Sequence, residues 1–390
     1  MPAEALAAGS RPAWLGEVRR FAQRNIAPRV DEMDRSARLD PELRDELFAS
    51  GIMALQTPAA YGGRDLPFLE AVRTVEEIAR VCPGVAVVVV VHNMLVSSTI
   101  RRHGSGDQRR RFLPALSRAM LGAFAISEEQ AGSDAFAVET VAEPDGTGFR
   151  LTGRKRWTSS ANAADLFIVF ARTSEAAGGR LSAFVVERES SGLSIERPLD
   201  QIGVRAAASA DLMLEEVPVR RDHVLSGPGQ GEIVALDAFA LGRVSIAAQL
   251  VGLAQAALDA AVAHASVREQ FGQPIGSFQG VRLPLAAIST DIEAARLLTW
   301  HCARAVERDA PQGQQLRLAA MAKYTASRTA TRASSQAIDT FGGRGVVRGG
   351  AVEKLFRDAC AGAVYEGTPN ILLRAIAADL FHATSAEDDD

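Results

Sequence analysis

Three long stretches rich in alanine and leucine restrict the possible folds of this chain more than any other feature. They cover residues 243–271, 292–308 and 316–339, and each leaves one face nearly free of charge. Helices of this length and composition usually pack side by side as a bundle. We therefore expect a C-terminal helical bundle over residues 229–390.

The middle of the chain, residues 121–228, has a different pattern. Short runs rich in valine, phenylalanine and leucine, such as "DLFIVFART" (165–173) and "LSAFVVERE" (181–189), alternate with Gly, Asp and Ser turns. This pattern is typical of an antiparallel sheet or barrel, and we predict an antiparallel β-barrel domain. The segment "SGPGQG" (226–231) lacks the Lys-Ser/Thr ending of a phosphate loop and is interpreted as a linker.

Residues 1–120 again have helical spacing, for example at Val18, Phe21, Ile26 and Val30. The run "VAVVVVV" (85–91) fits a strand by its β-branched residues and a buried helix by its surroundings, and we predict the helix. The expected fold class is therefore α+β, with an N-terminal helical domain, a middle β-barrel and a C-terminal bundle. The valine run alone is too short to span a bilayer, so we expect no membrane partner.

Composition limits the function classes. The chain has 390 residues, 47% of them hydrophobic, and a net charge of -4, as expected for a globular protein of two or three domains. Its basic clusters, such as "RRHGSGDQRRRF" (101–112), are balanced by acids elsewhere, so we expect no nucleic-acid partner. No metal-ligand spacing occurs among the six histidines, and we predict no metal site.

The N-terminal residues and the cysteines indicate where in the cell the protein is expected. The first 20 residues lack the apolar stretch of a signal peptide. The three cysteines, Cys82, Cys302 and Cys360, form neither a CxxC pair nor a disulfide framework. Both observations fit the reducing cytoplasm, which we take as the expected location.

Glu366 is the most unusual acidic residue. It lies in "AVYEGTPN" (363–370), between an aromatic residue and a Gly-Thr-Pro turn, with apolar sequence around it. Taken alone, it is either a solvated turn residue, which this short stretch favours, or a carboxylate placed against an uncharged group.

Five motifs in order resemble those of the acyl-CoA dehydrogenase family of flavoenzymes, most closely its short-chain branch. They are "PAAYGG" (58–63), "AISEEQAGSD" (125–134), "GRKRWTSSA" (153–161), "REQFGQPIGSFQ" (268–279) and "FGGRGVVRGGAVEKLFRDACAGAVYEGT" (341–368). Each motif is weak by itself. Their order and spacing over nearly the whole chain make the resemblance specific.

The resemblance implies FAD-dependent removal of hydrogens from the α and β carbons of a short-chain acyl thioester, acyl-CoA to trans-2-enoyl-CoA. Glu366 then matches the base that takes the α proton, with a pKa raised by burial. Its backbone N–H and a flavin hydroxyl would bind the thioester oxygen, and the β hydrogen would leave as hydride to flavin N5. The substrate pocket is implied at Ser133, Gly242, Arg243 and Gly367. Some relatives carry the base at the position of Gly242, where this chain has no side chain.

The resemblance also implies the residues that hold FAD. Residues of the middle domain would cover both faces of the flavin ring. Residues of the bundle would contact the diphosphate and the adenosine of FAD. In relatives the latter belong to a neighbouring subunit, so we expect a homotetramer; an electron-transferring flavoprotein is the expected acceptor. The implied cofactor residues are Phe124, Ile126, Ser127, Gly132, Ser133, Trp157, Thr158, Ser159, Arg268, Phe271, Gln279, Asp339, Phe341, Gly342, Gly343, Thr368 and Asn370.

Three positions depart from the family pattern. Glu129 stands where a proline is usual, Asp339 where a glutamine is usual, and Ala240 where an aspartate commonly contacts the pantetheine of CoA. The first two bear on flavin affinity. The third leaves open a different substrate, an acyl group on an acyl or peptidyl carrier protein. The sequence is also compatible with an oxygen-using acyl-thioester oxidase of the same fold and with a catalytically silent binding partner, although the intact Tyr-Glu-Gly-Thr turn argues against the silent partner.

Overall fold

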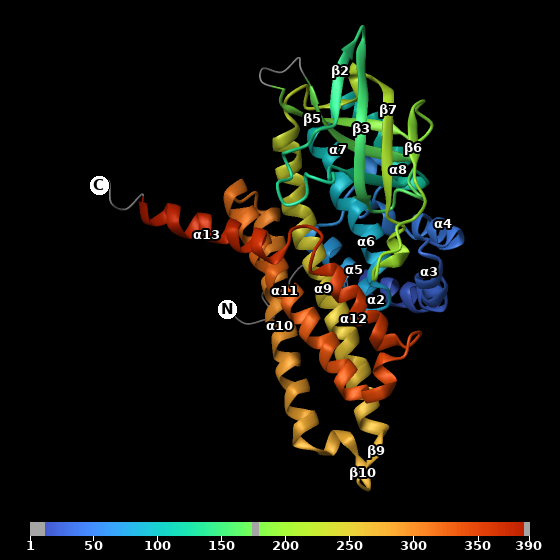
Figure 1. The fold of residues 1–390 in the computed structure, drawn as a ribbon, viewed down its shortest axis with the longest axis vertical. Helices are drawn as coiled ribbons and strands as arrows, with labels where there is room; N and C mark the ends of the chain where they lie inside the picture. The colour runs from blue at the N-terminus through green and yellow to red at the C-terminus, as the bar shows by residue number, and fades with distance from the viewer. Residues whose placement is uncertain (1–11, 174–178, 386–390) are drawn as a thin grey trace.

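The computed structural model describes residues 12–173 and 179–385, and the elements in them follow in three successive parts (Figure 1). Helices come first, an eight-stranded sheet second, and long helices last. This order is the predicted one.

The first part consists of short helices around a long apolar one. Asp40 caps one of them by accepting a hydrogen bond from Leu43 N (2.8 Å), and Ser105 forms a capping box with Gln108 in another. The elements are α2 (Pro12–Phe21), η1 (Ala22–Ile26), η2 (Ala27–Arg29), α3 (Val30–Ser36), α4 (Pro41–Ala49), η3 (Ile52–Ala54), η4 (Ala59–Tyr61), α5 (Phe68–Ala79), α6 (Pro83–Val90), η5 (Val91–Ser97), α7 (Ser98–His103) and α8 (Gly106–Arg118).

The valine run is helical, which confirms the prediction. It forms most of α6, whose residues are all buried, and continues through the π-helical η5 into α7. Burial on all sides outweighs the low helix propensity of valine. The run itself is short, but the helix from Pro83 to His103 is long and apolar enough to cross a membrane, as is the later α9. The apolar window of the first is wholly buried in the protein and that of the second mostly buried, as in core helices.

The middle part is a mixed sheet. Its elements are β1 (Gly122–Ala125), β2 (Val141–Asp145), β3 (Gly148–Thr158), β4 (Leu166–Thr173), β5 (Leu181–Glu187), β6 (Leu193–Ile195), η6 (Arg205–Ala207), β7 (Ala210–Arg220), η7 (Arg221–His223) and β8 (Val224–Leu225). The strand order is β6-β7-β3-β2-β4-β5-β8, and β1 pairs with β4. β1 and β2 run parallel to β4, whereas the other pairs are antiparallel.

The predicted barrel is not confirmed, because among the described strands the sheet does not close. It bends around an apolar core in which Phe149 of β3 meets Phe184 of β5, with ring centroids 5.4 Å apart. The outermost strands, β6 and β8, have only three and two residues and do not pair with each other. Such short edge strands offer too few backbone groups to complete a closed ladder.

The last part is the predicted bundle. Its elements are α9 (Gly231–Val267), β9 (Glu269–Gln270), β10 (Gln273–Pro274), η8 (Ile275–Ser277), α10 (Gln279–Glu307), α11 (Gln312–Phe341), η9 (Gly342–Val346), α12 (Ala351–Gly362) and α13 (Pro369–Ser385). The β9–β10 hairpin lies at the end of the molecule farthest from the large sheet (Figure 1).

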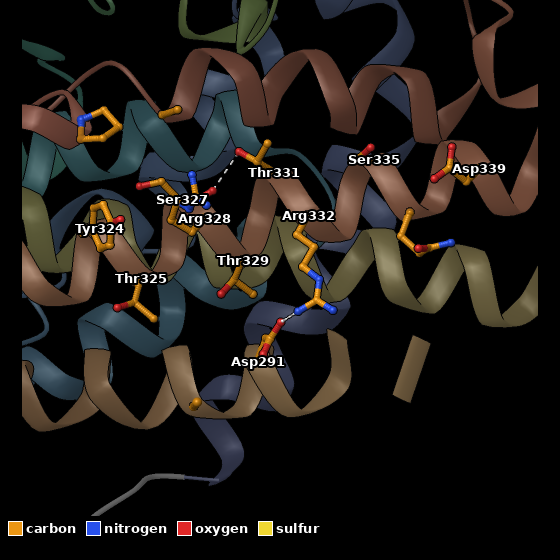
Figure 2. A pocket seen from close by; sticks show the side chains of 14 residues that line it. Asp291, Tyr324, Thr325, Ser327, Arg328, Thr329, Thr331, Arg332, Ser335 and Asp339 are labelled. Carbon is orange, nitrogen blue, oxygen red and sulfur yellow. Dashed lines mark hydrogen bonds and ion pairs between the residues drawn. The ribbon is translucent and has the colours of Figure 1, made fainter. Parts of the chain in front are cut away.

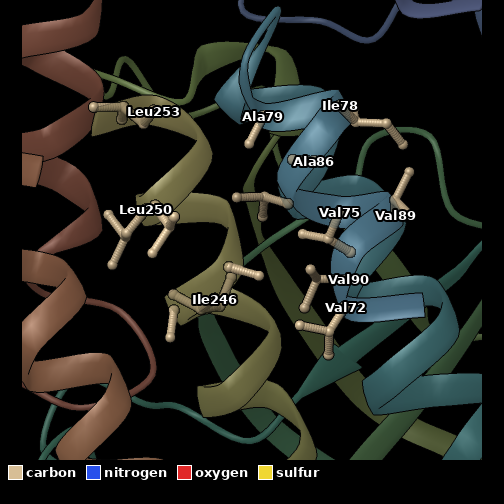
Figure 3. Close-up of a cluster of buried hydrophobic side chains, with 14 of the residues drawn as sticks. Val72, Val75, Ile78, Ala79, Ala86, Val89, Val90, Ile246, Leu250 and Leu253 are labelled. Atoms are coloured by element: carbon tan, nitrogen blue, oxygen red, sulfur yellow. The ribbon is translucent and has the colours of Figure 1, made fainter. Parts of the chain in front are cut away.

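One core joins the first and last parts. Val72 and Val75 of α5 belong to the same cluster as Ile246 of α9, and Figure 3 shows these helices beside each other. Leu250 of α9 lies against Gly362 of α12. Both the N-terminal helices and the other helices of the bundle therefore pack against α9. Side chains of both parts meet around the middle of α9.

Candidate active site

Glu366 lies in the turn between α12 and α13. Its φ is 57°, in the left-handed region, and Gly367 follows with a φ of 103°. A left-handed conformation is strained for a residue with a side chain and is a recurrent feature of functional sites. The turn directs the Glu366 carboxylate inward, toward α9.

The carboxylate packs against the backbone of Gly242 on α9. A Cβ at position 242 would lie 2.9 Å from Glu366 Oε2 and 2.8 Å from Leu95 Cδ2 of η5. A side chain at this position would therefore displace the Glu366 carboxylate or Leu95. Glu366 Oε2 is buried and accepts no hydrogen bond within the described part of the chain.

This setting changes the acidity of Glu366. Loss of hydration raises its pKa to about 7, and the positive charges of Arg243 and Lys323 partly oppose the rise. A carboxylate with a pKa near neutrality and a free oxygen can accept a proton from a weak acid.

Arg243 connects the carboxylate to the middle part of the chain. Burial lowers the pKa of its guanidinium, and the charge of Glu366 opposes that effect. The guanidinium lies 5.6 Å from the Phe239 ring centroid, and Phe239 stacks with Phe136 of the β1–β2 loop (6.4 Å between centroids). The predicted substrate residues Gly242, Arg243 and Gly367 thus lie together with Glu366, with Gly367 placed so that a Cβ there would be 3.8 Å from Arg243 Nε.

Lys323 of α11 was not predicted. Its side chain is fully buried, and its Nζ donates to Gly367 O (2.7 Å) and Ala363 O (3.1 Å). Burial lowers its pKa to about 8, and Glu366 opposes the fall. The only signal in the sequence is a single lysine at an inward position of the apolar run "LRLAAMAKYTAS" (316–327).

The predicted flavin wall lies on β1, on the loop after it and at the end of β3. Phe124 and Ile126 pack in the core, Ser127 O accepts a hydrogen bond from Arg156 N, and Gly132 and Ser133 are exposed. β3 has two register shifts, one of them between Lys155 and Thr158. Such bulges redirect side chains, and here Trp157, with a φ of 55°, is 44% exposed. Ser159 is half-buried beside it, and Thr158 Oγ1 and Ser160 Oγ are buried without a hydrogen-bond partner within the described residues.

A buried ion pair, also not predicted, underlies this wall. Lys155 Nζ contacts Glu128 Oε1 at 2.6 Å and donates to Ile126 O at 3.3 Å. Glu128 also accepts hydrogen bonds from Glu139 N and from the backbone and hydroxyl of Thr140. The two segments that carry the predicted flavin residues are therefore joined by this pair.

The other predicted cofactor residues lie elsewhere. Arg268 and Gln279 are exposed, and Phe271 of the β9–β10 hairpin is 94% exposed. Phe341 stacks on His264 at 4.1 Å, and the exposed Gly342 and Gly343 follow it. Along α11, Phe341 lies about 27 Å from Lys323. One chain therefore does not bring the predicted cofactor residues into one site; they form two separate groups.

A groove of about 920 Å³ runs along α11 (Figure 2). Tyr324 and Asp339 lie toward its two ends, and the Arg332–Asp291 ion pair lies between them. Pro369, beside the predicted Thr368 and Asn370 at the start of α13, also lines it. The groove thus joins the neighbourhood of the Glu366 turn to Asp339.

The three departures have distinct surroundings. Glu129 is exposed and pairs with Arg156, Asp339 is exposed in the groove, and Ala240 is buried in α9.

In the arginine-rich segment 101–112, Arg102 binds Asp237 through two hydrogen bonds, and Arg111 pairs with Glu187. Asp237 is about 200° around α9 from Phe239, so Arg102 meets α9 on the side opposite to the site.

Comparisons with known proteins cover nearly the whole chain. Models of the acyl-CoA dehydrogenase N-terminal, middle and C-terminal domains match residues 12–119, 123–217 and 229–381. The short/branched chain specific acyl-CoA dehydrogenase of Rattus norvegicus mitochondria is 40% identical over 361 residues, 92% of this chain and 83% of the relative. The chain belongs to the acyl-CoA dehydrogenase family.

Other family members are similar over almost their full length. The human short-chain specific acyl-CoA dehydrogenase of mitochondria is 35% identical over 95% of this chain and 89% of its own. The solved structure of butyryl-CoA dehydrogenase from Megasphaera elsdenii superposes with a TM-score of 0.91 at 32% identity, covering 95% of this chain and 97% of its own. The predicted resemblance to the family is thereby confirmed.

Proposed function

We propose that this protein catalyses the FAD-dependent α,β-dehydrogenation of a short-chain acyl-CoA to the trans-2-enoyl-CoA. The observation that carries the proposal is the buried Glu366 carboxylate in a chain of the acyl-CoA dehydrogenase family: one of its oxygens has no hydrogen-bond partner in residues 12–173 and 179–385, and its pKa is raised to about 7. The names of the rat, human and M. elsdenii relatives support a short acyl chain.

The residues of the site have complementary roles. Glu366 Oε2 accepts the α proton, and the Glu366 backbone N–H donates to the thioester oxygen as charge develops there. Gly242 leaves space for the carboxylate, and Leu95 and Phe239 exclude water from it. Arg243 favours the ionised form of Glu366 before the reaction. Gly367, in the same turn as Glu366, lies beside Arg243, and Ser133, exposed on the loop after β1, is the proposed contact from the middle part of the chain.

FAD fits the residues present. Thr158 Oγ1 and Ser160 Oγ are buried hydroxyls that lack partners within the described residues, and Trp157 presents an exposed ring beside them. Buried polar atoms of this kind usually have a partner. When bound, FAD supplies the acceptor that takes the β hydrogen with its electron pair. The residues that would hold its flavin end are Phe124, Ile126, Ser127, Gly132, Ser133, Trp157, Thr158, Ser159, Thr368 and Asn370.

We also propose a homotetramer in which the second group, Arg268, Phe271, Gln279, Asp339, Phe341, Gly342 and Gly343, completes the FAD site of a neighbouring copy. Its separation from the Glu366 turn and the exposure of Phe271 support this arrangement. Light scattering on the FAD-loaded protein tests it. A monomer that keeps FAD would contradict it.

Several further properties stay proposals. Domain boundaries at 120/121 and 228/229 are supported by the ends of the family-model matches. Cytoplasmic location without a membrane or nucleic-acid partner is supported by three free cysteines and the net charge. An electron-transferring flavoprotein is the proposed acceptor. Cell fractionation and reduction assays with that partner test these points.

The decisive experiment is an anaerobic titration of the purified FAD protein with acyl-CoA thioesters of increasing chain length. We expect the flavin colour to bleach with short chains. No bleaching with any thioester would contradict the function. Rapid return of the colour in air would instead indicate the oxidase.

The carrier-protein substrate is a second candidate. Ala240 is buried where relatives have an aspartate, and the lost hydrogen bond weakens binding of the pantetheine arm, which CoA and a carrier protein share, by about 0.5–1.5 kcal/mol. A docked carrier protein would offset this loss with binding energy of its own. The pairing of Arg102 and Arg111 within the chain reduces the basic surface available for a carrier. Comparing kcat/KM for one acyl group on CoA and on a carrier protein decides between them. Preference for CoA, unchanged by Ala240→Asp, would exclude the carrier.

A further inference from the structure

Lysine is used very selectively in this chain. Only three of the 43 basic residues are lysines, Lys155, Lys323 and Lys354, and arginine occupies every other basic position. All three lysines are buried, with 0%, 0% and 8% of their surface exposed. A lysine carries a compact point charge, whereas arginine carries a broad planar group. The distribution indicates that each lysine serves where a compact charge must fit inside the protein.

Lys323 differs from the other two in its partners. Lys155 contacts Glu128 and Lys354 contacts Asp358, both at 2.6 Å. Within the described residues Lys323 forms no such ion pair, and its Nζ instead donates to the carbonyls of Ala363 and Gly367. An ammonium buried without a directly bonded carboxylate is costly. The position therefore requires a reason other than general stability.

The two carbonyls bracket the turn that carries Glu366. Ala363 O lies just beyond the end of α12, and Gly367 O follows the two left-handed residues 366 and 367. Carbonyls at a helix end lack partners within the helix. By bonding both, Lys323 closes the turn from one side and opposes the strain at Glu366.

Two charged groups act on Glu366 among the residues that the structure describes. Arg243 faces it from α9 and Lys323 from α11, while η5 contributes the apolar Leu95. Tyr365, in the same turn, is neutral, since burial and the charges of Asp358 and Glu366 raise its pKa. Its hydroxyl donates to Gln249 Oε1 at 3.1 Å. Lys323 and Arg243 thus supply the positive charge that favours the ionised carboxylate.

We propose that Lys323 is a positioning residue for Glu366: its ammonium pins the two carbonyls that flank the base and supplies charge that keeps the base ionised. This inference rests on the proposed function, in which Glu366 removes the α proton. On this inference two helices keep Glu366 in its ionised, reactive form: α9 through the charge of Arg243, and α11 through the charge of Lys323.

Lys323→Gln tests the inference, with Lys354→Gln as the matched control. Both variants remove a buried ammonium, but Lys354 bonds to Asp358 of its own helix, α12. The measurement is the rate of flavin bleaching by a short-chain acyl-CoA as a function of pH. In the wild type we expect the rate to rise as Glu366 ionises, near pH 7.

Loss of the Lys323 charge disfavours the ionised carboxylate. The rising limb of the pH–rate profile therefore moves to higher pH. We expect a shift of about 1 pH unit in Lys323→Gln and no shift in Lys354→Gln. Lys323→Arg keeps the charge and keeps the limb at the wild-type pH, even if its bulk lowers the rate. An unshifted limb in Lys323→Gln would reduce Lys323 to a structural residue and overturn the inference.

A second measurement does not depend on activity. In a double-mutant cycle of unfolding midpoints at about pH 7.5, between the pKa of Glu366 at about 7 and that of Lys323 at about 8, Lys323→Gln should lower the midpoint less in a Glu366→Gln background than in the wild type. Equal effects in both backgrounds would overturn the coupling. If no thioester bleaches the wild-type flavin, the proposed function fails, but this cycle still tests whether Lys323 acts on Glu366.

Discussion

The middle sheet and the helical bundle each bury a glutamate near a lysine, and the two glutamates differ in chemistry. Glu128 contacts Lys155 at 2.6 Å and accepts hydrogen bonds from Thr140 and Glu139, so its pKa is lowered although burial opposes this. Glu366 has no hydrogen bond to Oε2 within the described residues, and burial raises its pKa to about 7.

The difference shows how one residue type serves two purposes. A buried carboxylate whose oxygens are satisfied is fixed in its ionised form and holds segments together. A buried carboxylate with a free oxygen exchanges protons near neutral pH. In the second case the lysine bonds to the backbone around the glutamate instead of to the glutamate itself.

Glu366→Gln should give the largest effect. The amide is nearly the same size but cannot accept the α proton, so the rate of flavin bleaching by a short-chain acyl-CoA should fall by at least ~10²–10⁴-fold. Affinity for the substrate should change little. Stopped-flow absorbance measures both. Turnover near the wild-type rate would show that another residue is the base. The contrast between Glu366 and Glu128 would then be wrong.

Glu128→Gln should chiefly affect stability. Removing one partner of a buried ion pair leaves Lys155 unpaired and costs about 3–5 kcal/mol in the free energy of unfolding. Denaturant unfolding measures this loss. The control is the double variant Glu128→Gln/Lys155→Met, which removes both charges but keeps an amide oxygen as acceptor for Glu139 N and Thr140, and should lose less than the single variant. An equal loss in the single and double variants would show that the contact itself matters little.

Gly242→Ala should lower the bleaching rate by roughly 10–10²-fold, because a methyl group would displace the Glu366 carboxylate by a fraction of an ångström. Gly313→Ala is the control, since nothing lies near a Cβ at that position. Equal rates in both variants would mean that the carboxylate moves freely past α9 and is not held against it.

The smallest effect is a pH-dependent gain in stability in Glu366→Gln. The folded protein has a raised pKa at this residue, so between pH ~4.5 and ~7 it keeps a proton that the unfolded chain has lost. The wild type therefore loses stability relative to the variant as pH rises through this range. We expect Glu366→Gln to melt a few degrees higher than the wild type at pH 8 and nearly equally at pH 4.5, measured by calorimetry. A gain that is the same at both values would exclude the pKa as its cause.

Much of the fold followed from sequence patterns. The long Ala-rich runs predicted the bundle, and the valine run was correctly expected to be helical because its neighbours are helical. The barrel was not confirmed, since alternation within strands gives no information on whether the edge strands pair. Sequence spacing likewise could not show that the residues matched to FAD separate into two groups along α11.

The sequence by itself determined the order of the three parts, the family and the identity of Glu366 as the candidate base, because these depend on local periodicity and on motifs. Only the tertiary structure decided that this glutamate is a usable base. Its pKa depends on burial against Gly242 and Leu95 and on the charges of Arg243 and Lys323, which come from distant parts of the chain. Electrostatic environment is a property of neighbours in space, and a motif of eight residues does not contain it.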